Sequence, residues 1–186
     1  VKRKISLIYK DPHLSDKITI TKKFKKKVVL ISLANNLNLF YNLYKINSNL
    51  IRFTMPKFLI DYITGDCRYN WIFRFHPTQS YNKEIFYNSW QYKLIKSIFN
   101  GQKNVYLDYK FSNTNLKSCL SISDYHIADS SAALITSHQL GIISGCWNNY
   151  LAVDRNRVDH FNSNKNSIFS IFTKKKIEIL LNKRQK

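Results

Sequence analysis

The sequence predicts an α/β protein in which a Rossmann-like parallel sheet carries helices on both faces. Two observations support this fold class. The stretch "VVLISLA" at residues 28–34 is almost continuously apolar and rich in β-branched residues, as in a strand that helices cover on both faces. Further short segments of this kind alternate with segments of helical spacing as far as residue 147. Such alternation is typical of parallel strands joined by right-handed crossovers.

The individual elements follow from these local patterns. Strands are expected at residues 28–34, 71–75, 104–109, 125–129 and 142–146. Helices are expected between them, at residues 36–53, 55–65, 83–99, 115–122 and 130–141. In the second of these helices, Pro56 suits the first turn and Gly65 the C-terminal cap.

Apolar spacing predicts which helical faces are buried. Between residues 83 and 99 the expected face consists of Phe86, Trp90, Leu94 and Ile98. The end of the chain is predicted to form a basic amphipathic helix with an apolar side made of Ile168, Ile171, Phe172 and Leu180. The chain thus divides into a basic N-terminal arm at residues 1–27, a Rossmann-like nucleotide-binding domain at 28–160 and a basic amphipathic C-terminal helix at 161–186.

The composition indicates an anionic partner. The chain has 186 residues and a net charge of +19, with 30 Lys and Arg against 11 Asp and Glu. Glu84 and Glu178 are its two glutamates, fewer than compositional drift alone would supply beside so many lysines. The candidate partners are nucleic acid, an anionic membrane surface and phosphorylated substrates. A solvated lysine surface without a partner is the alternative interpretation.

The cysteines and hydropathy favour a cytoplasmic location. Cys67, Cys119 and Cys146 are odd in number and widely spaced, with no spacing typical of a metal site or a disulfide framework. The longest apolar stretch is far shorter than the roughly 20 residues of a membrane span, and the basic start of the chain lacks the apolar stretch of a secretory signal. We therefore expect a cytoplasmic protein, with peripheral attachment at the inner face of the membrane as a further option.

The first candidate site lies in "NWIFRFHPTQ" at residues 70–79. Arg74 and His76 are two positions apart at the end of a predicted strand, so both should project to one side of it. Pro77 ends the strand and keeps His76 extended. Two cationic groups at a strand end suit a phosphate. A histidine that merely bonds to nearby backbone is the alternative interpretation.

The second candidate site lies in "ADSSAAL". Asp129 ends another predicted strand, and Ser130 and Ser131 open the helix that follows it. Serines at this position cap a helix by accepting backbone N–H groups, and the same N–H groups can bind a phosphate. Because ligands of open α/β sheets bind beyond the carboxyl ends of the strands, both candidate sites are expected at one edge.

The two motifs together resemble a known family. "RFHP" at residues 74–77 and "SDYHIADSSAALITSHQLGI" at residues 123–142 are similar to the nucleotide-binding half of GT-B glycosyltransferases with an HP motif and a paired-serine motif. These include bacterial sialyl- and polysialyltransferases, related capsule enzymes and the CDP-glycerol glycerophosphotransferases of teichoic-acid synthesis. The resemblance covers residues 28–147.

The resemblance implies a function. The chain would bind a CMP- or CDP-activated donor, such as a CMP-sugar or CDP-glycerol, for inverting transfer to a cell-surface glycan or polyol-phosphate acceptor. His76 would be the catalytic residue that stabilises the phosphate of the leaving nucleotide, and donor binding would involve Arg74, Pro77, Asp129, Ser130, Ser131 and Thr136. The resemblance implies neither a metal nor a further cofactor.

Two departures from the family stand out. Where many relatives have an acidic residue that meets the ribose, this chain has Thr136. A GT-B enzyme also has two Rossmann-like halves, and 186 residues accommodate one. The resemblance therefore implies a fragment, a degenerate copy, or a subunit that needs a separate N-terminal half.

Two other function classes stay open. A basic nucleic-acid-binding domain would use the 12 Tyr and 12 Phe for stacking beside the lysines, although no known nucleic-acid motif is present. A non-catalytic, degenerate glycosyltransferase scaffold would need neither His76 nor the serines. Binding of CMP or CDP distinguishes the first reading from these two.

Overall fold

The chain folds around one parallel sheet with helices on both faces. The computed structural model describes residues 24–33, 55–129, 133–147 and 168–183. Six strands lie in the order β3-β2-β1-β4-β5-β6, and every neighbouring pair is parallel. The predicted fold class and the parallel pairing of the five expected strands are confirmed, and β6 is an additional strand.

The strands are β1 (Val28–Ser32), β2 (Asn70–Arg74), β3 (Val105–Tyr106), β4 (Tyr125–Ala128), β5 (Ile143–Cys146) and β6 (Ile168–Ser170). All five residues of β1 are buried, as expected of a central strand covered on both faces. β3 is shorter than the predicted strand at residues 104–109, because the Asp108 side chain accepts the backbone N–H of Lys110 and starts a helix there.

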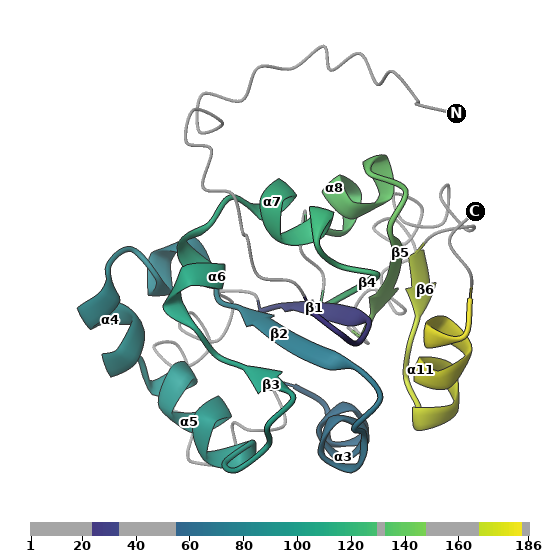
Figure 1. Cartoon of the computed structure of the whole chain (residues 1–186), viewed down its shortest axis with the longest axis horizontal. Coiled ribbons are helices and arrows are strands. Elements are labelled where there is room, and N and C mark those ends of the chain that lie inside the picture. The colour runs from purple at the N-terminus through teal and green to yellow at the C-terminus, as the bar shows by residue number, and fades with distance from the viewer. Residues whose placement is uncertain (1–23, 34–54, 130–132, 148–167, 184–186) are drawn as a thin grey trace, which may run out of the picture.

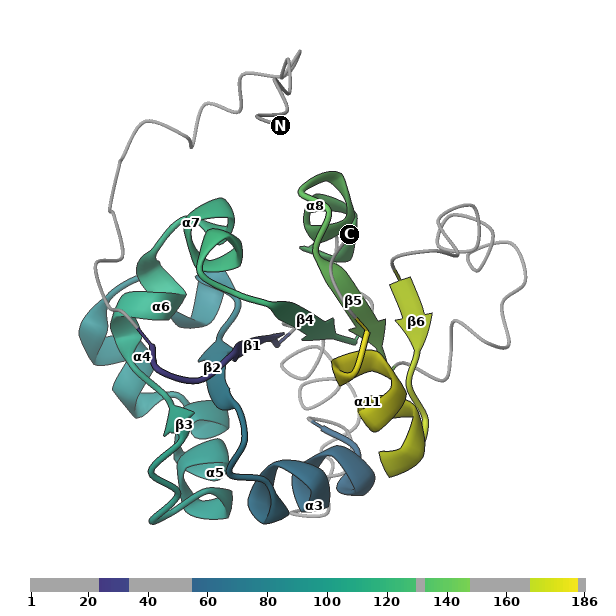
Figure 2. The same ribbon diagram turned by 45° about the vertical axis from the view of Figure 1, so that its right-hand side comes forward.

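The helices are α3 (Lys57–Gly65), α4 (Lys83–Asn88), α5 (Trp90–Ile98), α6 (Tyr109–Asn113), α7 (Leu116–Ser121), α8 (Ala133–Gln139) and α11 (Lys174–Leu181), with a 3-10 turn η3 at Pro77–Gln79. Figures 1 and 2 show α6, α7 and α8 on one side of the sheet and α3 and α11 on the other. The predicted helix at 36–53 lies outside the described residues.

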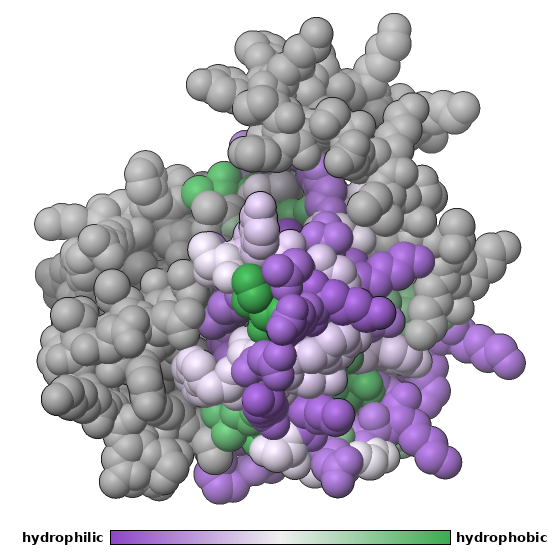
Figure 3. Space-filling view, turned by 90° about the vertical axis from the view of Figure 1, so that its left-hand side faces the viewer, coloured by the Kyte–Doolittle hydropathy of each residue, from purple (hydrophilic) through white to green (hydrophobic). Residues whose placement is uncertain are grey.

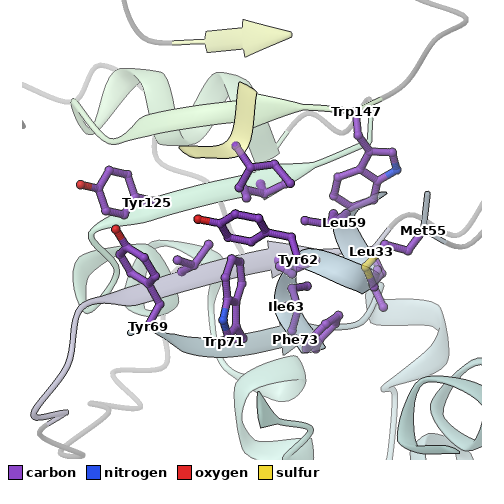
Figure 4. Close-up of a cluster of buried hydrophobic side chains, with 14 of the residues drawn as sticks. Leu33, Met55, Leu59, Tyr62, Ile63, Tyr69, Trp71, Phe73, Tyr125 and Trp147 are labelled. Carbon is purple, nitrogen blue, oxygen red and sulfur yellow. The ribbon is translucent and has the colours of Figure 1, made fainter. Parts of the chain in front are cut away.

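The larger core lies on the side of α3, α5 and α11. Its strand residues include Ile31, Trp71, Phe73 and Ile127, all fully buried. Figure 4 shows the aromatic part, where Tyr62 of α3 lies beside Trp71, with an edge-to-face contact of 6.1 Å between the ring centroids. Such ring pairs stabilise a core beyond the burial of their area. The opposite side buries a smaller cluster, which includes Leu30, Ile72, Phe111 and Leu120.

The predicted helix at 83–99 is in fact two helices. Ser89 breaks it: its backbone is extended, its hydroxyl donates to the carbonyl oxygen of Phe86, and its oxygen accepts the backbone N–H of Tyr92. The break shifts the buried face of the second helix to Gln91, Tyr92 and Ile95. The predicted face through Trp90, Leu94 and Ile98 was therefore wrong after Phe86, because serine can cap as well as continue a helix.

Two predicted helix ends are also shifted. Pro56 is the N-cap of α3 and does not lie in its first turn, and Gly65 is the last helical residue, with Asp66 as the C-cap. The left-handed conformation that favours glycine occurs instead at Gly101 (φ +81°) and Gly141 (φ +74°), which follow α5 and α8.

The predicted C-terminal helix at 161–186 was wrong in part. Residues Ile168–Ser170 form β6, which pairs with β5, and the helix starts only at Lys174. Ile171, Ile177, Leu180 and Leu181 are buried in the larger core. Since these residues complete the sheet and its cover, this segment is part of the domain.

Candidate functional site

The carboxyl ends of three neighbouring strands meet at one edge of the sheet. Ser32 ends β1 and pairs with Arg74 of β2 on one side and with Ala128 of β4 on the other. The strand order reverses at β1, since the chain runs to β2 and β3 on one side and to β4, β5 and β6 on the other. Ligands of open α/β sheets bind at such a reversal, outside the carboxyl ends of the strands. This edge is therefore the candidate site.

Arg74 is a cation at this edge that lacks a counter-charge among the described residues. Its Nη2 donates to the backbone oxygen of Thr114 over a long 3.4 Å, and its Nε is buried with no hydrogen-bond partner. Burial lowers the pKa of the guanidinium, and the adjacent Cys119 thiol offsets part of this effect. None of the ion pairs within the described part of the chain involves Arg74. A desolvated cation of this kind is suited to an anion.

His76 lies two residues beyond, at the N-cap of η3. Its Nδ1 accepts the backbone N–H of Thr78 at 3.3 Å and lies 3.0 Å from the Thr78 hydroxyl. If Nδ1 accepts that N–H, the neutral ring carries its proton on Nε2. Burial lowers the pKa of His76, and the charge of Arg74 lowers it further. At neutral pH the ring is therefore a neutral Nε2–H donor.

The local geometry follows the alternation expected from the sequence. Phe73 and Phe75 are fully buried in the larger core, while Arg74 turns to the opposite side of the sheet, toward α6 and α7. Pro77 is the first residue of η3, which ends the strand as predicted. His76 caps η3 by accepting the backbone N–H of Thr78, as the alternative interpretation of this histidine expects, and its contact with a phosphate stays a prediction.

The residues of the second motif are only partly described. Asp129 follows β4, and its backbone oxygen accepts a hydrogen bond from the Cys146 thiol. Thr136 lies half-buried on α8. Ser130 and Ser131 lie outside the described residues, so the predicted gap between His76 and the start of the following helix stays a prediction.

Sequence reasoning assigned no functional role to His126, which is fully buried near this edge. Its Nε2 lies 2.9 Å from the Ser32 hydroxyl, and its Nδ1 lies 3.0 Å from the Ser137 hydroxyl, which in turn contacts Ser144 at 2.7 Å. Burial lowers the pKa of His126 to about 3, with a smaller contribution from the charge of Arg74. Serines inside otherwise apolar strands were the signal that could have indicated this network.

The described residues contain neither a metal-binding cluster nor a membrane-spanning helix. No three His, Cys, Asp or Glu side chains within the described ranges are close enough to hold a metal ion. A membrane-crossing helix, long and apolar enough to span a bilayer, does not occur in those ranges either. On the side that carries α4, Figure 3 shows hydrophobic residues as small separate spots among hydrophilic ones.

Comparisons with protein-family models, with curated proteins and with solved structures gave no match to this chain.

Proposed function

We propose that this chain is the donor-binding half of a glycosyltransferase that uses a cytidine-nucleotide-activated donor. The observation that carries the proposal is Arg74, a largely buried guanidinium at the edge where the strand order reverses, with a buried Nε that lacks a partner. Burial of an unpaired cation costs desolvation free energy. Such a cation is therefore expected where a bound anion supplies the missing contact. A nucleotide phosphate is the anion that this edge of an open α/β sheet commonly binds.

In this proposal His76 is the catalytic residue. Its Nε2–H donates a hydrogen bond to the phosphate of the donor and stabilises the charge that develops as the nucleotide leaves. A fixed donor of this kind is worth roughly 3 kcal/mol of transition-state stabilisation. Ser130 and Ser131 would bind the same phosphate from the start of the next helix, and Thr136 would face the ribose.

The acceptor site belongs to a second half in this proposal. The donor is a CMP-sugar or CDP-glycerol, transfer is inverting, and the acceptor is a cell-surface glycan or polyol phosphate supplied with a partner half. The protein works in the cytoplasm, and its net charge of +19 holds it at an anionic membrane surface.

Equilibrium binding of CMP and CDP to the full chain tests the proposal. Arg74→Met and His76→Ala should each weaken binding by roughly tenfold or more, because each removes a hydrogen bond to a charged group. Lys93→Met and His138→Ala are the matched controls, since they remove the same residue classes from α5 and α8. Far-ultraviolet circular dichroism should be unchanged in all four variants.

The stability of Arg74→Met adds an independent check. Since its charge is desolvated and poorly paired, the free energy of unfolding should stay within about 1 kcal/mol of the parent or increase. A loss of several kcal/mol in Arg74→Met together with unchanged nucleotide affinity would mean that Arg74 is structural. Failure of the parent chain to bind either nucleotide would refute the proposal outright.

A further inference from the structure

A pocket lies at the amino-terminal edge of the sheet, at the opposite end of β2 from Arg74. Its walls come from the segment before β1, from the start of β2 at Asn70, and from the loop between α5 and β3. The cavity volume is about 580 Å³. That volume lies within the range of roughly 300 to 1,000 Å³ that is usual for small-molecule sites.

The charge of this pocket has one sign. Lys25, Lys26 and Lys103 line it, and none of its described lining residues is Asp or Glu. The three lysines come from two segments that are far apart in the sequence and adjacent in the fold. Ammonium groups gathered around a cavity without carboxylates attract an anion, and lysine is a common ligand of phosphate.

The walls of the pocket are held by hydrogen bonds. Lys26 Nζ donates to the backbone oxygen of Cys67 at 2.5 Å, and the Asn70 amide donates to the backbone oxygen of Lys26 at 3.1 Å. The Asn104 amide donates to the backbone oxygens of Asp66 and Tyr69 at 2.7 and 3.1 Å. These bonds tie the three segments together, so the site is formed before a ligand arrives, which reduces the cost of binding.

One wall is aromatic. Phe24 and Tyr106 meet edge to face, with ring centroids 5.3 Å apart and an interplanar angle of 79°. Both rings are half-buried, which leaves part of their surface on the pocket. An aromatic wall beside cations suits a ligand that joins a phosphate to a flat ring.

We propose that this pocket binds a phosphate-bearing ligand of up to nucleotide size, with the phosphate on Lys25, Lys26 and Lys103 and the ring against Phe24 and Tyr106. The ligand is either a free phosphorylated molecule or one unit of a single-stranded nucleic acid, which share this chemistry. The proposal does not rest on the donor site at the opposite edge.

Cys67 supplies a local readout. It lines the pocket and is exposed, whereas Cys119 and Cys146 are buried. The rate at which iodoacetamide alkylates Cys67 in the full chain is measured by mass spectrometry, with and without inorganic pyrophosphate or an oligothymidylate of about twelve nucleotides. A bound ligand should slow the alkylation, and the concentration dependence yields its Kd.

The pocket variant carries Lys25→Gln, Lys26→Gln and Lys103→Gln. Its matched control carries Lys83→Gln, Lys93→Gln and Lys175→Gln, three exposed lysines elsewhere, so both variants have the same net charge. The Kd of a protecting probe should rise by about tenfold or more in the pocket variant and much less in the control. Equal weakening in both variants, or protection by neither probe, overturns the proposal.

The same measurement separates this site from the donor site. Arg74→Met should leave the protection of Cys67 unchanged, and the pocket variant should leave CMP binding at the other edge unchanged. If pyrophosphate protects Cys67 and the oligonucleotide does not, the ligand is a free phosphorylated molecule. If the oligonucleotide protects Cys67 with a much lower Kd than pyrophosphate, the ligand is a nucleic acid strand. If Arg74→Met abolishes the protection of Cys67, the anion binds at the donor edge and the proposal is overturned.

Discussion

At the scale of single residues, His126 and Arg74 show how the fold sets the properties of a charged or titratable group. Ser137 donates its one hydroxyl proton to the backbone oxygen of Leu134 at 2.8 Å. Each ring nitrogen of His126 has a hydroxyl partner, Ser137 at Nδ1 and Ser32 at Nε2. The neutral ring is satisfied on both sides, whereas the guanidinium of Arg74 keeps a buried donor without a partner.

His126 should make the stability of the protein depend on pH. An unfolded histidine takes up a proton as the pH falls through about 6.5, whereas folded His126 does so only near a pKa of about 3. The neutral form is thus favoured by folding, and this stabilisation is present above pH 6.5 and decreases as the pH falls toward 3. Chemical denaturation from pH 7 to 4 should show a decline of up to about 1.4 kcal/mol per pH unit from this group.

His126→Gln tests this dependence. The variant removes the titrating ring, so its free energy of unfolding should depend less on pH than that of the parent over the same range. His138→Gln, an equal change in histidine content on α8, should keep the parental dependence. If the free energies of unfolding of the parent and of His126→Gln change with pH in parallel, the surroundings of His126 do not keep the folded ring neutral.

At the scale of elements, helix capping and strand pairing decided what the apolar spacing left open. The segment at 83–99 has apolar residues at helical spacing throughout, yet Ser89 caps a new helix there because its hydroxyl and its oxygen both find backbone partners. Residues 168–170 lie in a stretch with amphipathic helical spacing, yet they form β6 because β5 offers them a free strand edge.

The close approach of α11 to β5 makes Gly145 a sensitive position. A Cβ added at Gly145 would lie 2.9 Å from Leu180 Cδ2 and 3.0 Å from Ile171 Cδ1. Gly145→Ala should therefore reduce the free energy of unfolding by about 1 to 3 kcal/mol, as expected for overpacking. Thermal or chemical unfolding measures this loss.

Gly65→Ala is the matched control for that experiment. A Cβ at Gly65 meets nothing within 4 Å, and Gly65 is the last residue of α3. The substitution should be neutral or stabilise by about 0.5 kcal/mol, because alanine favours a helix more than glycine does. Equal losses in the two variants would show that contact with α11 is not the cause.

At the scale of the whole molecule, the domain extends beyond the expected boundary at residue 160. β6 and α11 bring Ile171, Ile177, Leu180 and Leu181 into the same core as α3 and β1. Tyr69 and Tyr125 also donate hydrogen bonds to the backbone oxygens of Leu181 and Lys183, at 3.2 and 2.9 Å. The last strand and helix are thus held to the domain by both apolar and polar contacts.

A chain ending at residue 160 should consequently fail to fold cooperatively. The truncation leaves the apolar surface beneath α11 in water, and a mixture of aggregated and protease-sensitive protein is the expected product. In the full chain, Leu180→Ala should cost about 2 to 5 kcal/mol, whereas Ile179→Gln, at a side chain that is 46% exposed, should cost little. Cooperative unfolding of the truncated chain would show that α11 is an accessory element.

The sequence by itself determined the class of fold and the approximate position at which one strand ends. Buried strands are apolar at successive positions, and that signal is local, so the parallel sheet and the end of β2 ahead of Pro77 could be predicted. A short stretch of sequence carries this information because the backbone geometry of a strand fixes how neighbouring residues are placed relative to one another.

The tertiary structure decided the rest, because contacts between distant segments have no local signature. It set the neutral state of His126 through burial, beside Ser32, which lies 94 positions away, and it set the burial of Arg74 beneath α6 and α7. It also decided that residues 168–170 pair as a strand, and that Lys25, Lys26 and Lys103 surround one pocket. In each case the stability of the arrangement depends on a contact with a distant segment of the same chain, and that contact exists only in the folded state.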